Sequence, residues 1–422
     1  MNVESRRDNR VEFAVTQRFP NGLSETETFE TRETSERRQA RLIRVNRPET
    51  DGWTNSGLPS SAAVGTEIGP AISDGVLEWL DPLRDSRWAS FVAQTAGSSV
   101  FETCEWLSAL RREYAYEPIA LGVADRDTRA VRSGLVLCRI ETSLRQRALV
   151  SLPFSDHCSL LAASRDDRAL LLAALRDEQR SGRCHSVELR LRAPISEIEP
   201  AFSKSQSYFL HTVDLSGGLD SVAARFHKNH VLRKIRRSER EGLRCVEGHD
   251  RELLNAFYDL LVRTRRRHGL PPQPLEWFEA ILSSLKQRAA IRVAYKGRMP
   301  VAAVVTLTHR GTVTYKYGAS DERYHSFGGM QLLLWKTIED ASAAGFTELD
   351  MGRSATDQAG LVAFKEHWGA TRETLSYFTC PKPSPIRKGL MRGTLGVVRW
   401  VLSHSPRSAL VRLGRALYHH AG

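Results

Sequence analysis

The sequence predicts an α+β protein that contains two consecutive copies of one structural unit, preceded by a disordered extension. Three observations support this prediction. The same order of helices and strands occurs twice, at a spacing of roughly 160 residues. The first part of the chain is poor in apolar residues, and no apolar run reaches the roughly 18 residues that a transmembrane helix needs.

The extension comprises residues 1–73. The stretch SETETFETRETSERRQAR is charged and rich in Thr and Glu, and NSGLPSSAAVGTEIGP consists mainly of small residues. Neither stretch can bury enough apolar surface to offset the conformational entropy that folding removes. We therefore expect residues 1–73 to be disordered, with a transient helix around residues 37–44.

The first copy of the unit is expected within residues 74–200. Its elements are, in order, the helix CEWLSALRREY, the strands PIALGVAD, SGLVLCRIET and RALVSLPF, the helix RALLLAALRDEQRS and the strand HSVELRLR. The polar loop SDHCSLLAASRDD joins the third strand to the second helix. This order predicts a meander of antiparallel strands that passes through a helix into a further strand.

The second copy is expected within residues 208–380. Its elements are the helix LLNAFYDLLVRTRRR, the strands AIRVAYKG, MPVAAVVTLTH and TVTYKYGA, a helix at residues 330–344 and the strand TELDM. A repeat of this length is typical of duplicated domains rather than of a solenoid. Each copy should therefore form a mixed, mostly antiparallel sheet flanked by helices.

This order of elements resembles the GNAT acyltransferase fold. In that family a glycine-containing loop before the helix holds the pyrophosphate of coenzyme A, and FGG at residues 327–329 occupies that place. A helix N-terminus favours anions, so the resemblance implies that Gly328, Gly329, Met330 and Gln331 bind the donor. The alternative is a turn without a ligand. The matching loop of the first copy has no glycine, which favours the ligand.

The tandem arrangement resembles the FemAB family and its BioF2-like branch over residues 75–380. The stretches that carry the resemblance are RKIRRSEREGL, TRRRHGLPPQP, YKYGAS, DMGRS with GLVAFKEHWGA, and SLPFSDHC. Family members join an acyl or aminoacyl group to an amine, notably in peptidoglycan cross-bridges and cell-envelope polymers. The resemblance implies an N-acyltransferase with acyl-coenzyme A or aminoacyl-tRNA as donor, an amine as acceptor and no permanently bound cofactor.

Acyl transfer requires a stabilised oxyanion and removal of a proton from the amine. Lys365 is the candidate for charge stabilisation, because Phe364 and Trp368 would exclude water around it and the family has a lysine of a matching Phe-Lys pair at its active site. A surface lysine lying over Trp368 is the alternative. Asp156 and His157 follow a strand end, where they could bind or deprotonate the amine. A turn-capping role is the alternative for Asp156.

Other candidates for substrate contact are basic or aromatic. Arg236 and Arg237 belong to a basic helix that the family places beside a phosphate-bearing substrate, although such a face is usually just solvated. Lys316 and Tyr317 lie on a strand that should flank the site, and alternation sends them to opposite faces. Arg353 follows the last strand of the second copy and could pair with a phosphate or a carboxylate.

The net charge of +12 predicts an anionic partner such as a phosphate, tRNA or an acidic membrane surface. Much of the excess lies in residues 381–422, which contain eight Lys or Arg and no acidic residue. This tail is amphipathic, with Leu410, Leu413 and Leu417 on one face. Peripheral contact of residues 385–422 with an anionic membrane and docking onto the protein's own core are both open.

The six cysteines are scattered and form no CxxC pair, so neither a metal site nor a disulfide scaffold is predicted. The start MNVESRRDNR has no apolar segment behind it, so no signal peptide is expected. These features predict a cytoplasmic protein, peripheral at the inner face of the cell membrane if the tail binds lipid. The sequence indicates no oligomeric state. A GNAT-fold binding module for nucleic acid or envelope assembly is the alternative to an enzyme.

Overall fold

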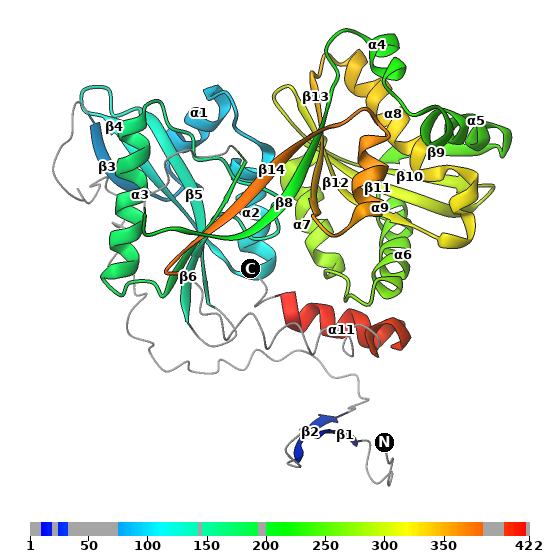
Figure 1. Cartoon of the computed structure of the whole chain (residues 1–422), viewed down its shortest axis with the longest axis horizontal. Coiled ribbons are helices and arrows are strands. Elements are labelled where there is room, and N and C mark those ends of the chain that lie inside the picture. Colours follow the sequence, from blue (N-terminus) through cyan, green and yellow to red (C-terminus); the bar gives the residue numbers. More distant parts are fainter. Residues whose placement is uncertain are drawn as a thin grey trace. The chain divides into compact units, whose positions relative to one another are not determined.

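The computed structural model describes residues 10–18, 24–32, 75–141, 146–192, 200–382 and 401–418 (Figure 1). Contacts divide the chain into two compact units, residues 1–57 and 58–422. In the first unit, β1 (Arg10–Arg18) pairs antiparallel with β2 (Ser24–Arg32). These two strands lie within the segment predicted to be disordered, and their Val, Thr and Phe residues favour extended backbone; the disorder of residues 1–73 as a whole stays a prediction. The helix expected around residues 37–44 lies outside the described residues.

The second unit is built on one mixed sheet, and the described residues contribute twelve strands to it. Its first-domain strands are β3 (Gly75–Leu80), β4 (Glu117–Asp125), β5 (Val131–Glu141), β6 (Arg147–Val150) and β7 (Ser186–Leu191). Its second-domain strands are β8 (Ser203–Asp214), β9 (Leu243–Gly248), β10 (Ala289–Lys296), β11 (Met299–His309), β12 (Thr312–Ser320), β13 (Glu348–Ala355) and β14 (Thr371–Cys380). The order across the sheet is β3-β4-β5-β6-β7-β14-β8-β13-β12-β11-β10-β9.

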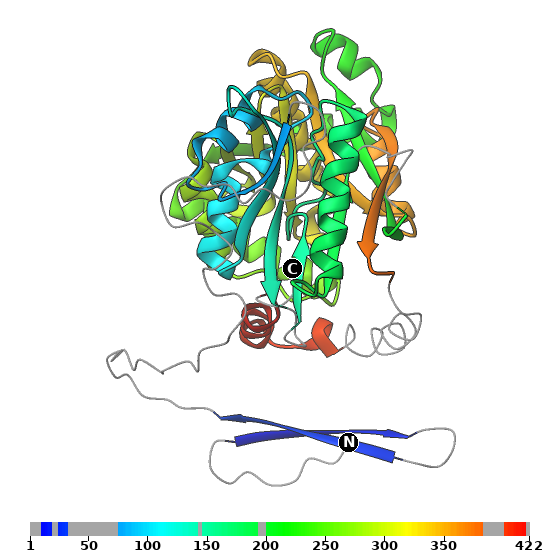
Figure 2. The same cartoon turned by 90° about the vertical axis from the view of Figure 1, so that its left-hand side faces the viewer.

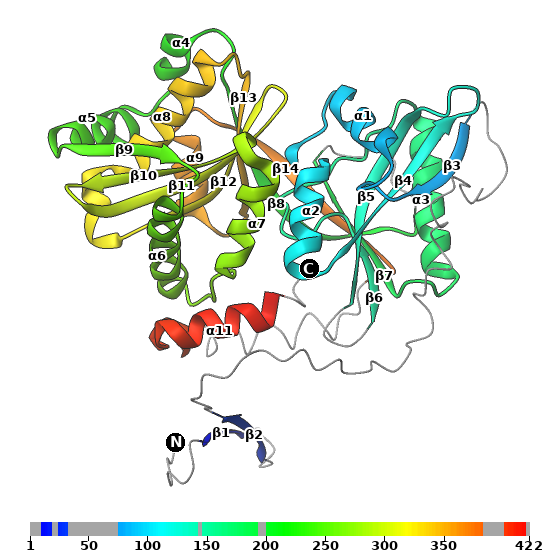
Figure 3. The same ribbon diagram turned by 180° about the vertical axis from the view of Figure 1, so that it is seen from behind.

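Helices cover both faces of this sheet. The first domain has α1 (Ser86–Gln94), α2 (Cys104–Tyr114) and α3 (Arg165–Arg180). The second has α4 (Leu219–Ala224), the π-helix η2 (Lys228–Leu232), α5 (Arg233–Arg240), α6 (Arg251–Arg267), α7 (Leu275–Leu285), the 3-10 helix η4 (Glu322–Phe327), α8 (Gly329–Ala343) and α9 (Ala359–Glu366). Figure 2 shows α3 on the opposite face of the first-domain strands from α1 and α2. Figure 3 shows α6 and α7 in front of the second-domain strands, with α8 behind them.

The predicted α+β fold with two copies of one unit is confirmed. In the first copy, β6 pairs parallel with β7 at Ala148 and Ser186, after a crossover through α3. In the second copy, β12 pairs parallel with β13 at Thr312 and Glu348, after a crossover through α8. The other strand pairs of both copies are antiparallel. The two copies also share β14, which pairs with β7 on one side and with β8 on the other.

An aromatic core joins the two domains. Helix α2 packs against α7, and the rings of Trp106 and Trp277 meet edge to face with their centroids 5.2 Å apart. Both tryptophans are fully buried. Since burying apolar surface is the main stabilising contribution to folding, this contact holds the two domains together as one body.

Helix α11 (Arg407–Tyr418) packs on the protein itself. Leu410 is fully buried, and a Cβ added at Gly414 would lie 2.0 Å from the carbonyl oxygen of Pro272. The Tyr418 carbonyl accepts a hydrogen bond of 3.0 Å from the Tyr116 hydroxyl. For α11, the structure therefore shows docking onto the core through Leu410 and Gly414, whereas Leu417 stays 48% exposed. None of the described helices is long and apolar enough to span a membrane.

Candidate functional site

The parallel strands β12 and β13 diverge in the middle of the second domain. Their pairing covers only Thr312–Thr314 with Glu348–Asp350. A register shift in the pairing of β13 with β8 follows at once, between Asp350 and Arg353. Bulges of this kind re-aim side chains and are frequent beside active sites. The point where β12 and β13 separate is therefore a natural place for a ligand or for reacting groups.

A loop of the first domain reaches this point. It contains two non-glycine residues in the left-handed region, Leu152 with φ 59° and Phe154 with φ 60°. Bulky residues adopt such angles only where the surrounding structure enforces them. Here the Ser151 hydroxyl accepts a 2.7 Å hydrogen bond from the Arg190 amide, and the Tyr377 hydroxyl donates a 2.7 Å bond to the Asp156 carbonyl. The strained loop thus holds Asp156 against the second domain.

Asp156 pairs with two cations of the second domain. The Lys316 ammonium lies 3.2 Å from one carboxylate oxygen, and the Arg353 guanidinium lies 3.6 Å from the other. Burial raises the pKa of Asp156, but the charges of Lys316 and Arg353 outweigh it, so the pKa falls below its ordinary value. Burial also lowers the pKa of Lys316, and Asp156 opposes that change. The three groups therefore form a coupled charge cluster between the domains.

The Lys316 ammonium is surrounded by aromatic rings. It lies 4.9 Å from the centroid of Phe101, 5.8 Å from that of Trp106 and 5.5 Å from that of Tyr317. These contacts stabilise a cation that has lost most of its water. The Tyr317 hydroxyl accepts a 2.8 Å bond from the indole N–H of Trp277, so Tyr317 belongs to the interdomain core. Its predicted contact with substrate is not supported by this packing.

His157 forms a second link between the domains. Its Nε2 lies 2.8 Å from a carboxylate oxygen of Asp350, and both side chains are almost fully buried. The other oxygen of Asp350 accepts a 2.7 Å bond from the Gly352 amide. Burial raises the pKa of Asp350, but the hydrogen bond and charge of His157 outweigh it and lower the pKa overall. Because His157 is enclosed, it is suited to positioning Asp350 rather than to removing a proton from a substrate.

Lys365 is buried beside this cluster. Its ammonium donates to the carbonyl oxygens of Gly352 at 2.8 Å and Arg353 at 2.9 Å. Burial lowers the pKa of Lys365 to about 8, against the opposing charges of Asp156 and Asp350. With only 2% of its surface exposed, Lys365 is not a surface residue lying over Trp368, and that alternative is wrong. One of its three N–H donors remains for a further partner.

Arg353 connects the cluster to solvent. Its side chain is 36% exposed, and its guanidinium donates a 2.8 Å bond to the Tyr377 hydroxyl. The guanidinium also lies 4.5 Å from the ring centroid of Tyr208. This fixed but partly exposed cation can bind an incoming carboxylate or phosphate. Sequence reasoning missed Tyr377, because nothing in TRETLSYFTC shows that its strand crosses to the first domain.

Gly352 lets the backbone of β13 approach this cluster. Its φ is +71°, and a Cβ added there would lie 2.9 Å from a carboxylate oxygen of Asp156. We expect Gly352→Ala to lower the free energy of unfolding by about 1–2 kcal/mol from backbone strain alone and to displace Asp156. Chemical denaturation and turnover are the measurements. Gly360→Ala in α9 is the matched control, because its Cβ meets nothing within 4 Å. Equal effects of the two variants would contradict this role of Gly352.

Four other predicted substrate residues lie apart from the cluster or in the core. Trp368 is fully buried, with its ring centroid 5.0 Å from that of Phe226, and Phe364 packs against the same apolar cluster. Arg236 is exposed on α5, and Arg237 pairs with Glu241. Trp368 and Phe364 therefore anchor α9 to the apolar core. Arg236 and Arg237 lie on a face of α5 that is exposed to solvent.

The glycines before α8 pack against the protein itself. Gly328 has φ +79°, and a Cβ there would lie 2.3 Å from the carbonyl oxygen of Lys234 in α5. A Cβ at Gly329 would lie 3.1 Å from the Cβ of Ala302 in β11. Both glycines are buried, whereas Met330 and Gln331 are half-buried. Close packing of α8 thus explains the glycine pair, and the structure does not bring these residues to the charge cluster.

Replacing Gly328 with Ala tests the packing role directly. We expect Gly328→Ala to lower the free energy of unfolding by about 1–3 kcal/mol, as overpacking does, and to leave donor affinity unchanged. Gly345→Ala, at the other end of α8, is the control, because it has φ +78° and an open Cβ position. The comparison separates the clash from backbone strain. Loss of donor affinity in a folded Gly328→Ala protein would restore the ligand interpretation.

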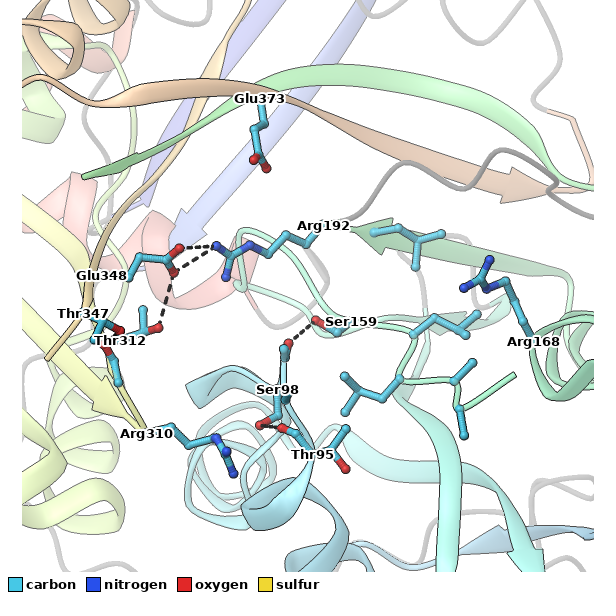
Figure 4. A pocket seen from close by; sticks show the side chains of 18 of the residues that line it. Thr95, Ser98, Ser159, Arg168, Arg192, Arg310, Thr312, Thr347, Glu348 and Glu373 are labelled. Carbon is cyan, nitrogen blue, oxygen red and sulfur yellow. Dashed lines mark hydrogen bonds and ion pairs between the residues drawn. The ribbon is translucent and has the colours of Figure 1, made fainter. Parts of the chain in front are cut away.

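A cavity of about 1160 Å³ opens between the domains (Figure 4). Arg168 and Arg192 line it from the first domain, and Arg310 and Glu348 line it from the second. The Arg192 guanidinium donates to both carboxylate oxygens of Glu348, at 2.9 and 2.8 Å. The cavity and the charge cluster share strand β13: Glu348 lines the cavity, and Asp350, two residues later, lies beside the cluster. Its arginines and its hydroxyl-bearing Ser and Thr residues suit a polar, anionic ligand.

Comparisons with known proteins agree with this fold. The model of the GNAT acetyltransferase domain matches residues 225–366. The crystal structure of FemX is similar with a TM-score of 0.58 and 13% identity, over 73% of this chain and 98% of that chain.

Two further structures are more distant. The C-terminal domain of a putative lysylphosphatidylglycerol synthetase from Agrobacterium fabrum has a TM-score of 0.46 and 13% identity, over 74% of this chain and 96% of that chain. A tandem GNAT protein from the clavulanic acid biosynthesis pathway has a TM-score of 0.44 and 14% identity, over 73% and 99%. The search of curated proteins found no significant match.

Proposed function

We propose, from the premise that this chain is a tandem GNAT protein of the FemAB-like branch, that it transfers an acyl or aminoacyl group from an activated donor to an amine. The observation that carries the proposal is the buried charge cluster at the divergence of β12 and β13. Asp156 from the first domain meets Lys316, Arg353 and Lys365 from the second there. A buried set of paired charges with perturbed pKa values is typical of a functional site.

The amine nitrogen attacks the acyl carbonyl, and the thioester or ester bond to the donor breaks. Lys365 is suited to stabilise the oxyanion, because its ammonium is already held in a dry site and has one free donor. Arg353 would bind a carboxylate or phosphate of a substrate. Asp156 is a poor base, because its pKa is lowered, and it would serve to hold Lys316 and Arg353 in place. The leaving thiolate or alkoxide takes up the proton that the amine releases.

The acceptor would enter through the interdomain cavity. Arg168 and Arg310 provide positive charge there, so an amine on a phosphate-bearing cell-envelope precursor fits its chemistry. Such a precursor and both donor classes are cytoplasmic molecules, which supports a site of action in the cytoplasm or at the inner face of the cell membrane.

Coenzyme A and tRNA differ in what they need from the protein. Of the glycines that would hold a pyrophosphate, Gly328 packs against α5 and Gly329 against β11, whereas the net charge of +12 suits a polyanion. We therefore favour aminoacyl-tRNA as donor. The test incubates the full chain with either acyl-coenzyme A or aminoacyl-tRNA and with amines that carry phosphates, and measures the mass of the acceptor. If both donors bind but neither increases the mass of the acceptor, the proposal is overturned. That outcome would identify a binding module instead.

That second candidate, a non-catalytic GNAT-fold binding module for nucleic acid or envelope assembly, has one observation in its favour. The packing of Gly328 against Lys234 removes the phosphate loop that GNAT enzymes use. A binding module would bind tRNA or an envelope precursor with the same affinity in wild type and in Lys365→Met, and would form no product.

A further inference from the structure

Three histidines gather on the surface of the second domain, outside the charge cluster. His227 is the N-cap of η2, His230 lies within η2, and His367 follows the last residue of α9. One candidate ligand nitrogen from each of the three lies within 4.8 Å of those of the other two. His227 and His230 are exposed, and His367 is half-buried. The scattered cysteines predicted no metal site, but the HKNH stretch at residues 227–230 already placed two imidazoles one helical turn apart.

The backbone that carries these histidines is firmly fixed. The His227 amide donates a 2.8 Å bond to the His367 carbonyl. The neighbouring rings of Phe226 and Trp368 are buried against each other. A Cβ added at Gly369 would lie 2.7 Å from the Cβ of Arg225, so the two segments touch directly. The imidazoles therefore project from two chain segments whose separation cannot change much, as a preorganised ligand set requires.

We propose that His227, His230 and His367 form a binding site for a transition-metal ion, with Zn²⁺ as the best match, that clamps the end of α9 to η2. Neutral imidazole is a preferred ligand of zinc, and three protein ligands leave an open position for water. Imidazole nitrogens on one tetrahedral zinc ion lie ~3.3 Å apart at Zn–N distances near 2.0–2.1 Å. The present nitrogens lie within 4.8 Å of one another, so the side chains must rotate inward to bind one ion.

Two rearrangements of the side chains accompany binding. The rings of His230 and His367 are stacked, with their centroids 4.2 Å apart and their planes 4° from parallel, and they must turn so that one nitrogen of each faces the ion. The Nδ1 atom of His227 accepts long bonds from the amides of Asn229 at 3.2 Å and His230 at 3.3 Å. Ligation through Nε2 moves the proton of that ring to Nδ1 and releases both bonds. These bonds are at the weak end of the normal range, so they oppose the metal little.

The site differs from the acyltransferase chemistry but is connected to it. Lys365 lies two residues before His367, at the end of the same helix. An ion that clamps α9 to η2 would therefore restrain the helix that positions Lys365. The ion contacts no reacting group, so the proposal does not depend on the chain being an enzyme.

The test uses the full chain without a polyhistidine tag, titrated with Zn²⁺ by calorimetry. We expect one ion per chain and a rise in melting temperature with Zn²⁺. His230→Ala and His227→Asn should each weaken Zn²⁺ binding at least ~100-fold. Loss of a residue that only hydrogen-bonds to a metal ligand usually has a smaller effect. Asn is chosen at position 227 because it retains a side-chain helix cap. His185→Ala, at an exposed histidine of the first domain, should bind as wild type does.

Two outcomes would overturn the proposal. One is an affinity for Zn²⁺ that is the same in wild type, His230→Ala and His227→Asn, which would indicate adventitious binding elsewhere. The other is the absence of measurable binding by a folded wild-type chain. If one variant fails to fold by circular dichroism, His367→Gln provides the same comparison from the other segment. Binding by Co²⁺ should give the visible absorption of an imidazole complex in wild type and not in these variants.

Discussion

Replacing Lys365 with Met is expected to lower kcat at least ~100-fold, the scale of losing one donor to an oxyanion. Methionine keeps most of the volume but lacks the ammonium group. Its removal leaves the carbonyls of Gly352 and Arg353 without this donor, which is unfavourable. It also removes a buried charge whose pKa is already lowered to about 8. The two effects oppose each other, so we expect the variant to stay folded.

The pH dependence of kcat gives an independent measurement. Lys365 is an ammonium ion below pH 8, so a role in charge stabilisation predicts that kcat falls as the pH rises through about 8. Lys365→Arg, which stays charged, should keep a lower kcat that does not fall in this range. A kcat that rises through pH 8 would instead make Lys365 a base. Near-normal turnover of folded Lys365→Met would exclude it from the mechanism.

Folding stability should respond to the same group. The unfolded chain holds the proton of Lys365 up to its ordinary pKa of 10.5, whereas the folded chain releases it near pH 8. The unfolded state therefore binds more protons between these values, and the free energy of unfolding rises with pH across that interval. Lys365→Met should lack this contribution.

The second large effect is expected at Asp156. Asp156→Asn leaves the Lys316 ammonium, whose side chain is only 5% exposed, without its carboxylate. Removing one partner of a buried ion pair costs about 3–5 kcal/mol. The aromatic rings around Lys316 keep some stabilisation, so we expect a loss of roughly 3 kcal/mol, measured by chemical denaturation. Turnover should fall as well, because Arg353 loses the group that orients it.

A double-mutant cycle provides the control. Asp156→Asn combined with Lys316→Met removes the buried charge together with its partner, so the double variant should be more stable than Asp156→Asn alone. Additive losses in the two single variants and the double variant would show that the pair is not coupled. The same cycle with Arg353→Met should give a smaller coupling, because Arg353 is partly exposed and lies farther from Asp156.

Local periodicity was sufficient to predict α3, α8 and the central strands of both domains, because each of these elements has its own apolar pattern. It did not predict β14, since TRETLSYFTC is largely polar and its partners β7 and β8 come from distant parts of the chain. Positions on or after predicted strands, together with the family resemblance, identified Asp156, Lys316, Arg353 and Lys365 as candidates. It could not show that Asp156 binds Lys316, because that contact depends on how the two domains pack.

The glycine pair is a case in which a sequence pattern predicted a contact with ligand that the packing does not support. Gly328 and Gly329 have the sequence pattern of a phosphate loop, but whether a glycine faces a ligand or another helix depends on what lies against its Cα. Here that neighbour is the carbonyl of Lys234, from a helix that the local sequence around Gly328 does not reveal. His157 is similar, because its position after a strand end suggested a base, whereas its burial against Asp350 makes it a link between domains.

The insertion of β14 between β7 and β8 has a consequence for biosynthesis. A ribosome releases the first domain long before it makes Thr371–Cys380, so the edge of β7 is without its neighbour while the second domain is being synthesised. Unpaired strand edges favour aggregation, and contacts between distant residues slow folding. Nascent chains that end before β14 should therefore be held by chaperones, and a premature stop codon in the last part of the gene would damage the first domain as well as the second.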